Sequence, residues 1–465
     1  MNQRDLPIYS AQDELLYALR SQPRVILSAP TGSGKSTQVP QIILDHGLAG
    51  DDQIVVLQPR RLAARLLARR VANERGVPVG SEIGYQVRFE NHTSSKTRIV
   101  YVTEGILLRR LIDDPQLEGI SIILFDEFHE RHLFGDVTLA RAMLLQRSSR
   151  SDLRLLVMSA TLDIHSLAGY LEPCKVVESK GRTFPVAIRY LDKPHHARKQ
   201  SPWALAASTF EQIVRSGAEG NVLIFMPGRY EIRKTMEEIC RLPASRGFTI
   251  LPLHGDLPPA DQDAAVTPGS TRKVVISTNI AETSITIEGV RIVIDTGLAR
   301  MHRFDPYRGI NTLLIEKISR AAADQRAGRA GRTAPGVCVR LWSDKQHQER
   351  SLRETPEILR LDLAEVILSL KAGGIVDIDS YPWIDRPLEH AVERAVTLLT
   401  DLGGLAPEDG HVTQIGRRLL SFPVHPRYAR MLIAAEDFDC VREAALAAAL
   451  TQDRSLLVRN PGKII

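Results

Sequence analysis

Residues 28–37 read SAPTGSGKST, and this stretch decides the fold class. It follows an apolar run at Val25–Ser28 and precedes a helical pattern. Gly32 and Gly34 allow a turn that points backbone amides at an anion, and the helix N-terminus adds a positive dipole end. Strand, loop and helix in this order are typical of a phosphate-binding α/β domain. The alternative is a glycine-rich turn that only happens to precede Lys-Ser, and Ala29 does replace the usual first glycine.

Short apolar runs recur through the first half of the chain and predict the strands of a parallel sheet. They are continuous rather than alternating, as expected for strands buried on both faces. Helical patterns at 62–74 and 105–113 fit the crossover helices. The predicted strands are Val25–Ser28, Ile54–Leu57, Ile99–Val102, Ile120–Asp126 and Leu153–Ser159.

The alternation stops in a turn-rich segment, residues 179–202, and then restarts, which predicts a second α/β domain. After about residue 351 helical patterns dominate, for example at 362–372 and 388–402. The sequence ends soon after an Ala-rich helical stretch, so we expect the last domain to be incomplete. The strands predicted for the second domain are Val222–Met226, Thr249–Leu253, Lys273–Ser277, Val290–Asp295 and Val337–Trp342.

The composition is that of a globular protein. Its 465 residues suggest about three domains, and 43% hydrophobic with 25% charged residues excludes a disordered chain, a collagen and a disulfide miniprotein. The formal charge of +5 favours an anionic partner only weakly. The four cysteines form no CxxC pair. Without a signal-like N-terminus or a membrane-length apolar run, the sequence predicts a cytoplasmic protein.

A second motif, Asp126-Glu127-Phe128-His129, ends a predicted strand of the same sheet as the phosphate loop. Lys35 can reach the β- and γ-phosphates of a nucleotide, and Ser36 and Asp126 can hold Mg²⁺. Glu127 can then orient and deprotonate a water molecule. By itself an Asp-Glu pair after a strand is usually a solvated turn, but beside a phosphate loop it indicates a hydrolytic site.

The sequence QRAGRAGR at 325–332 is the most specific motif of the second half. Its arginines, Arg326, Arg329 and Arg332, are spaced to share one helical face. A cluster of cations is costly unless an anion meets it, and a γ-phosphate across a domain interface would be such an anion. The alternative is a solvated basic helix.

Together these motifs resemble the DEAH/RHA group of superfamily 2 helicases, most closely its bacterial HrpB-type branch. The matching segments, in order, are APTGSGKS (29–36), QPRR (58–61), VTEG (102–105), DEFHER (126–131), SAT (159–161), GRTFPV (181–186), LIFMPG (223–228), STNIAETSITIEG (277–289), QRAGRAGR (325–332) and ETPEI (354–358). The resemblance covers nearly the whole chain.

The resemblance implies an α/β fold with two tandem RecA-like domains. The expected divisions are 1–182 and 183–350 for these domains, 351–425 for a helical winged-helix-like domain, and 426–465 for the start of a ratchet-like helical domain. An NTP, ATP or another, is expected in the cleft between the RecA-like domains together with Mg²⁺.

The same resemblance assigns roles to single residues. Lys35 and Glu127 are the expected phosphate ligand and catalytic base, and His129 is expected to couple the site to Gln325. Ser159 and Thr161 are expected to link nucleotide state to domain movement. The remaining expected nucleotide-site residues are Gly32, Ser33, Gly34, Ser36 and Thr37 in the loop, Asp126 for the metal, Arg329 and Arg332 as arginine fingers, and Glu288 near the ribose.

A nucleic-acid path is also implied. Its expected residues are Arg60, Arg61, Thr103, Glu104, Gly105, Thr278 and Asn279, which would contact the backbone without reading sequence. For the nearby Arg65, Arg69 and Arg70, an ordinary solvated helix face is equally acceptable. The family carries a strand-separating β-hairpin at the position of 303–314, and DPYRG at 305–309 supplies suitable turn residues. A basic stretch at 411–435, with Arg417, Arg418, Arg427 and Arg430, is either a further contact or surface charge.

One departure concerns the base. Many eukaryotic relatives place an aromatic residue under it where this chain has Val266, so weak discrimination among NTPs is expected.

The sequence therefore predicts an NTP-dependent helicase, acting as a monomer on single-stranded or tailed RNA with 3′-to-5′ movement, with or without a protein activator. An RNA-stimulated NTPase clamp that does not unwind, and a motor on DNA, stay open as alternatives.

Overall fold

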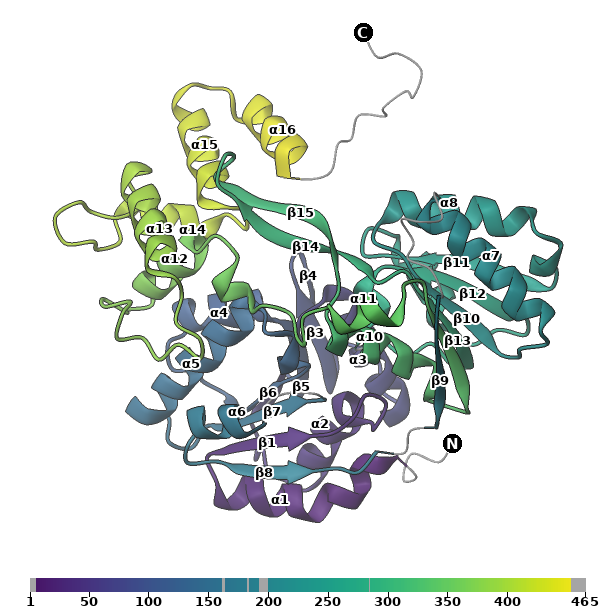
Figure 1. The fold of residues 1–465 in the computed structure, drawn as a ribbon. Coiled ribbons are helices and arrows are strands. Elements are labelled where there is room, and N and C mark those ends of the chain that lie inside the picture. Colours follow the sequence, from purple (N-terminus) through teal and green to yellow (C-terminus); the bar gives the residue numbers. More distant parts are fainter. Residues whose placement is uncertain (1–5, 161–163, 182–183, 192–199, 284, 453–465) are drawn as a thin grey trace, which may run out of the picture.

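The first sheet forms around the phosphate-loop strand. The computed structural model describes residues 6–160, 164–181, 184–191, 200–283 and 285–452 (Figure 1). The first sheet has eight strands in the order β4-β3-β5-β2-β6-β7-β1-β8. The strands are β1 (Arg24–Ser28), β2 (Gln53–Gln58), β3 (Ile83–Val87), β4 (Glu90–His92), β5 (Ile99–Thr103), β6 (Ile120–Phe125), β7 (Arg154–Ser159) and β8 (Lys175–Glu178).

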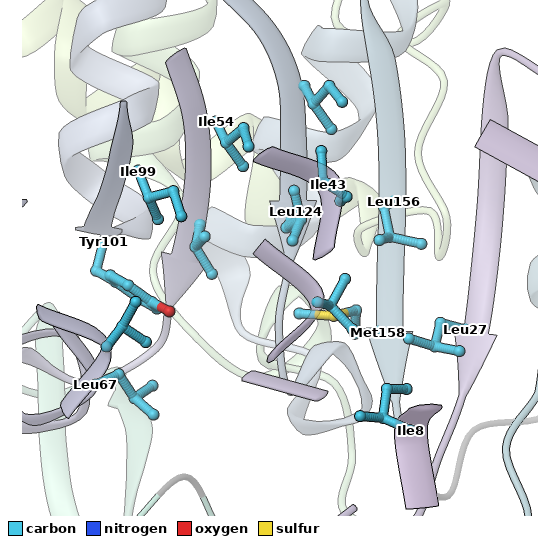
Figure 2. Packing of buried hydrophobic residues seen from close by; sticks show 14 of the residues in the cluster. Ile8, Leu27, Ile43, Ile54, Leu67, Ile99, Tyr101, Leu124, Leu156 and Met158 are labelled. Atoms are coloured by element: carbon cyan, nitrogen blue, oxygen red, sulfur yellow. The ribbon is translucent and has the colours of Figure 1, made fainter. Parts of the chain in front are cut away.

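Apolar side chains on one face of this sheet bind the helices that cover it. Figure 2 shows Leu27, Leu124 and Met158 of the strands facing Ile43 of the phosphate-loop helix. Burying each such side chain stabilises the fold by about 1.5–3 kcal/mol, so the loop is held between a packed strand and a packed helix. The helices of this domain are α1 (Gln12–Ser21), α2 (Lys35–Asp45), α3 (Arg61–Arg75), α4 (Glu104–Asp113), α5 (Leu133–Ser148) and α6 (Ile164–Tyr170).

The second sheet is parallel and has six strands in the order β11-β12-β10-β13-β16-β9. Its strands are β9 (Val186–Tyr190), β10 (Asn221–Phe225), β11 (Phe248–Leu253), β12 (Arg272–Ser277), β13 (Val290–Asp295) and β16 (Gly336–Arg340). Its helices are α7 (Pro202–Arg215), α8 (Arg229–Arg241), α9 (Pro259–Val266), α10 (Arg320–Gly328) and α11 (Asp344–Gln348). The prediction of two parallel α/β domains is confirmed.

Every predicted strand is present, but four others were not predicted. β3 and β4 form a short pair at one edge of the first sheet, and β8 and β9 are the edge strands next to the domain crossover. β9 is largely exposed and β4 reads Glu-Asn-His. The edge strands β4, β8 and β9 need no continuous apolar run, because one side remains open to water. β3 is paired on both sides, and Gly84 and Gln86 interrupt its apolar run.

A two-stranded antiparallel hairpin, β14 (Leu298–Asp305) and β15 (Ile310–Lys317), projects from the second domain (Figure 1). The resemblance predicted a hairpin at 303–314, and the observed one is longer on both sides. Asp305 closes its turn, since its carboxylate accepts the amides of Tyr307 and Arg308 at 3.0 and 3.3 Å. Gly309 takes a φ of +64° there, which favours glycine.

The C-terminal region is helical and packs on the first domain. It contains α12 (Ala364–Ala372), α13 (Glu389–Asp401), α14 (Gln414–Ser421), α15 (Pro426–Asp437) and α16 (Val441–Gln452). Val137 of α5 and Leu108 of α4 share its apolar core with Ile367 and Leu399. The hairpin also reaches it, because Arg427 donates to the Gly309 carbonyl at 3.3 Å. None of the helices in the described residues is long and apolar enough to cross a membrane.

Candidate nucleotide site at the domain interface

The phosphate loop joins β1 to α2. Its left-handed residues are Gly32 and Gly34, with φ of +85° and +94°, so Ala29 needs no glycine freedom. The Ala29 amide donates to the Ser159 carbonyl at 2.9 Å, which joins the loop to the end of β7. Lys35 begins α2, so the helix N-terminus and the ammonium lie together, as an anion site requires.

The carboxylates that the sequence singled out lie against this loop. Lys35 Nζ is 3.3 Å from Glu127 Oε2, and both side chains are buried. Glu127 has a left-handed backbone with φ of 51°, which is rare for a residue other than glycine, asparagine or aspartate. Such strain is held by the surroundings and is common at functional sites. The turn thus aims Glu127 back at the loop instead of continuing the strand.

The neighbouring Asp126 faces the hydroxyl of Ser36. Burial and the adjacent charge of Glu127 raise the pKa of Asp126 to about 6, against hydrogen bonds from Ser36 and Gln58. Burial would also raise the pKa of Glu127, but Lys35 and then His129 lower it below its ordinary value. Two adjacent buried carboxylates beside a serine hydroxyl form an oxygen donor set of the kind Mg²⁺ prefers.

His129 and Gln325 meet across the interface between the two domains. Gln325 Nε2 is 2.5 Å from His129 Nε2, and His129 Nδ1 is 3.6 Å from Glu127 Oε2. Burial lowers the pKa of His129, which favours the neutral ring, and a neutral imidazole can accept a hydrogen bond from the amide of Gln325. The structure therefore links the second domain to the carboxylate cluster through one imidazole.

The three arginines of 325–332 do not share one helical face, which corrects the sequence prediction. α10 ends at Gly328, and a short 3₁₀ turn carries Arg329. Arg326 is fully buried and pairs with Asp295 and Glu282, each at 2.9 Å. Protein carboxylates, not a ligand, therefore neutralise Arg326. The spacing rule failed because the glycines end the helix.

Arg329 and Arg332 remain as the cations facing the first domain. Arg329 donates to the carbonyls of Glu282, Thr283 and Ile285, while the Arg332 side chain lies over Gly32 of the loop. Burial and then the repulsion of Arg332 lower the pKa of Arg329 well below its ordinary value. Burial lowers the pKa of Arg332 to about 10, and its buried Nε has no hydrogen-bond partner in the described residues. A polyanion would offset the free-energy cost of burying the Arg329 and Arg332 charges, so the residues present fit a triphosphate with its metal.

A cleft of about 290 Å³ opens beside Arg332. The loop residues Thr31 and Gly32 form one wall, and Phe184 and Ile188 of the second domain form another. Phe184 lies in the GRTFPV segment that the family resemblance matched, but no role in the nucleotide site was expected for it, because an aromatic residue in a turn-rich segment carries no chemical signal of its own.

Four other expected residues have no side-chain contact with this cluster among the described interactions, or lie outside the described chain. The Glu288 side chain is exposed, and its backbone carbonyl accepts from Asn221 at 2.7 Å. Val266, at the end of α9, packs on an apolar cluster that includes Leu62 of the first domain. Ser159 is buried, and Thr161 lies outside the described residues.

The expected nucleic-acid residues are partly engaged within the protein. Arg60 binds Glu130 at 2.6 and 2.9 Å and Thr283 at 2.5 Å, so side chains of both domains engage its guanidinium. Arg61 and Gly105 are exposed, and Thr103, Thr278 and Asn279 are partly exposed. Burial, as the main cause, raises the pKa of Glu104 to about 7. Arg60 therefore joins the two domains, and Arg61 and Gly105 are the most accessible of the expected residues.

The arginines of α3, whose ion-pair partners could not be predicted from the sequence, form ion pairs with carboxylates of the protein. Arg65 and Arg69 pair with Asp263 of α9 at 3.1 and 2.6 Å, while Arg70 pairs with Glu74 at 2.9 Å. Two of the three thus cross from the first domain to the second. In the C-terminal stretch, Arg418 pairs with Glu436 at 2.6 Å.

A charged network leads from the carboxylate motif to the helical region. His132 lies 2.9 Å from Glu130 and 3.3 Å from Glu357. Burial opposes the charge on His132, but Glu357 and Glu130 raise its pKa well above the ordinary value. Burial likewise opposes the charge on Glu357, yet His132 lowers its pKa to about 2.

We expect His132→Gln to lower stability in a pH-dependent way. The raised pKa of His132 contributes its full stabilisation of the folded state below pH 6.5, the ordinary histidine pKa. This stabilisation is lost as the pH rises through the higher pKa of the folded protein. The lowered pKa of Glu357 stabilises the folded state above pH 4.5, the ordinary glutamate pKa, and this stabilisation is lost as the pH falls towards 2. The stability difference should therefore be largest, about 2 kcal/mol, between these limits and should shrink in alkali. Urea unfolding from pH 5 to 9 measures it.

His411→Gln is the matched control, because His411 pairs with Asp409 at 2.9 Å on the open surface. We expect no measurable change from it. A His132→Gln deficit that stays constant across this pH range would contradict the ionic role of His132.

Comparison with known proteins adds the following similarities. Residues 9–168 match the DEAD/DEAH box helicase family, residues 206–334 the helicase conserved C-terminal domain, and residues 425–464 the ratchet-like helicase associated domain HA2. The chain is 40% identical over 451 residues to the ATP-dependent RNA helicase HrpB of Escherichia coli strain K12, covering 96% of this chain and 55% of that protein.

Two crystal structures of Escherichia coli HrpB are similar to the fold described here. One, described as a DEAH/RHA helicase, has a TM-score of 0.89 at 39% identity and covers 97% of this chain and 57% of that chain. The other, described as a DExH-box NTPase, has a TM-score of 0.84 at 39% identity and covers 98% and 56%. The chain thus spans a little over half the length of the relatives it matches.

Proposed function

The chain belongs to the DEAD/DEAH box helicase family, and we propose that it is an NTP-dependent RNA helicase that hydrolyses ATP and other NTPs to move along single-stranded RNA. The observation that carries the proposal is the convergence at the domain interface. Lys35 and Glu127 of the first domain lie 3.3 Å apart, and Arg332 of the second domain lies over Gly32 of the same loop.

The residues of the site divide the hydrolytic chemistry among them. Ser36 and Asp126 would hold Mg²⁺, which neutralises phosphate charge when bound. Lys35 and the amides of the loop bind the phosphates, and Glu127 orients a water and takes its proton. The finger arginines, Arg329 and Arg332, supply positive charge from the second domain to the γ-phosphate.

Movement follows from contacts that span the two domains. Gln325 contacts His129, and Arg60 binds both Glu130 and Thr283. Loss of the γ-phosphate would therefore alter contacts that hold the two domains together. Arg61 and Gly105 on the first domain and Thr278 and Asn279 on the second would hold the RNA backbone separately. When the domains separate after hydrolysis, one set of contacts advances along the strand.

RNA as the substrate and a 3′-to-5′ direction rest on the family resemblance. The HrpB relative is named an RNA helicase. In this scheme the β14–β15 hairpin would separate strands, because it projects from the second domain and reaches the helical region through Arg427. Monomeric action and a cytoplasmic location remain predictions of the sequence.

Steady-state hydrolysis tests the proposal directly. We expect single-stranded RNA to stimulate NTP hydrolysis, because RNA held by both domains favours the closed interface that completes the site. Single-stranded DNA is the comparator, since backbone contacts alone do not test for a 2′-hydroxyl. Hydrolysis that neither nucleic acid stimulates would contradict a coupled motor.

Strand displacement separates a helicase from an NTPase clamp. On a duplex with a 3′ single-stranded tail, the helicase releases the displaced strand only with hydrolysable NTP. RNA-stimulated hydrolysis without displacement would favour the clamp, and faster displacement on a 5′-tailed duplex would contradict the direction.

We further expect GTP, CTP and UTP to support hydrolysis with kcat/KM values that lie within about 200-fold of the value for ATP. Val266 packs in an apolar cluster and offers no aromatic face or hydrogen-bonding group to a base. Discrimination without hydrogen bonds is limited to about 1–3 kcal/mol. A panel of the four NTPs measures kcat/KM for each, and a strict requirement for ATP would overturn this expectation.

A further inference from the structure

We propose that Gln58 is a positioning residue for the metal site, which holds the Asp126 carboxylate in the orientation that receives Mg²⁺ with the nucleotide. This inference rests on the proposed NTP hydrolysis. The motif containing Gln58 was expected to serve nucleic-acid binding through Arg60 and Arg61, and no role was expected for the glutamine itself.

The sheet register places Gln58 beside Asp126. β2 and β6 are parallel neighbours with Leu57 opposite Phe125, so the next residue of each chain emerges at the same edge. Gln58 is fully buried there, and its Nε2 donates to Asp126 Oδ2 at 2.6 Å. Asp126 Oδ1 accepts the Glu127 amide at 2.9 Å. Both carboxylate oxygens thus have a donor, and together with the hydrogen bond from Ser36 these fix the plane of the carboxylate.

The other end of the Gln58 amide is informative. An ionised carboxylate only accepts hydrogen bonds, so the NH₂ group must face Asp126 and Oε1 must face away. Within the described residues this buried Oε1 has no hydrogen-bond partner. A buried acceptor without a partner costs about 1–3 kcal/mol. Packing alone does not recover this cost, so the unpaired Oε1 points to a functional reason for a glutamine beside Asp126.

A partner that orients a metal-binding carboxylate acts on metal affinity more than on folding. Outer residues of this kind typically change affinity or activity 10–100-fold when they are replaced. A merely structural glutamine would instead change stability and all ligand binding together. The dependence of nucleotide binding on Mg²⁺ therefore separates the two roles.

The test measures binding of a fluorescent ATP analogue to the full chain over a range of Mg²⁺ concentrations and, separately, in EDTA. Gln58→Met keeps the length of the side chain and removes the donor. Gln58→Asn keeps a buried amide but draws it back by one carbon, which preserves a foldable variant. We expect half-saturating Mg²⁺ to rise about tenfold in Gln58→Met and in the same direction in Gln58→Asn, with binding in EDTA unchanged.

Gln53→Met is the matched control. Gln53 lies on the same strand and its Nε2 donates to the Thr97 carbonyl at 3.0 Å, far from the nucleotide loop. Its Mg²⁺ dependence should equal that of the unmodified chain. A Gln58→Asn variant with unchanged Mg²⁺ dependence, or with an equal loss of binding in EDTA, would overturn the proposal. Failure of RNA to stimulate hydrolysis would overturn the helicase assignment alone, because the binding test does not use RNA.

Discussion

Replacing Glu127 by Gln should lower kcat for NTP hydrolysis at least about 10²-fold, the lower range for loss of a general base. The amide keeps the shape of the side chain and can still accept from Lys35, which lies 3.3 Å away. It cannot take a proton from water. Because the substitution also removes a negative charge beside the phosphates, nucleotide affinity should be kept or increased.

The measurement is single-turnover hydrolysis with saturating RNA, together with nucleotide binding at equilibrium. Glu211→Gln serves as the control. Glu211 lies on α7, outside the nucleotide site, and its carboxylate is 2.6 Å from the guanidinium of Arg215. If Glu127→Gln keeps more than a tenth of the activity, another group must be the base.

Replacing Arg332 by Ala should have the largest effect of any change in the second domain. Arginine fingers contribute about 10³–10⁵ to kcat. The Arg332 side chain approaches Gly32 of the loop from the other domain and has a buried Nε without a partner in the described residues. Its Nη1 donates to the Thr286 hydroxyl at 2.6 Å, and the charge of Glu127 offsets only part of the cost of its burial, so a phosphate would add a direct partner. We expect a loss of about 10³-fold in kcat with a much smaller change in KM.

Arg332→Lys should recover little of this loss, because an ammonium cannot reproduce the planar guanidinium. Arg291→Ala is the control, since Arg291 pairs with Glu219 at 3.1 Å at the surface. Arg326→Ala should differ in kind. It leaves Asp295 and Glu282 unpaired in the core, so we expect unfolding at lower denaturant concentration. Kinetics of Arg332→Ala close to those of the unmodified chain would exclude it as a finger.

The two sheets and the local chemistry of the nucleotide site could be predicted because short segments carry them. A buried strand needs a continuous apolar run, and a phosphate loop needs its glycines and lysine in fixed positions next to a helix. Lys35, Ser36, Asp126 and Glu127 follow strands of one sheet, so their meeting at its edge follows from the parallel order. The edge strands escaped prediction because they lack such runs.

The partners of the charged residues could not be predicted, because each depends on two segments that only the packed domains bring together. Arg60 and Thr283 are 223 positions apart, and Gln325 and His129 are 196 apart. The sequence of an arginine motif is the same whether its partner is a phosphate or a carboxylate. In the structure Arg326 pairs with Asp295, whereas the Arg332 side chain faces the phosphate loop.

The groups that can bind and hydrolyse a nucleotide could thus be identified before folding is considered, because their spacing along strands, turns and helices is a local property. The packing of the two domains sets which cations pair with carboxylates inside the protein, which face the cleft, and which neighbour orients Asp126. Ion pairs and hydrogen bonds depend on distances in space. The register of β2 against β6 sets the distance between Gln58 and Asp126, and the packing of one domain on the other sets the distances across the interface.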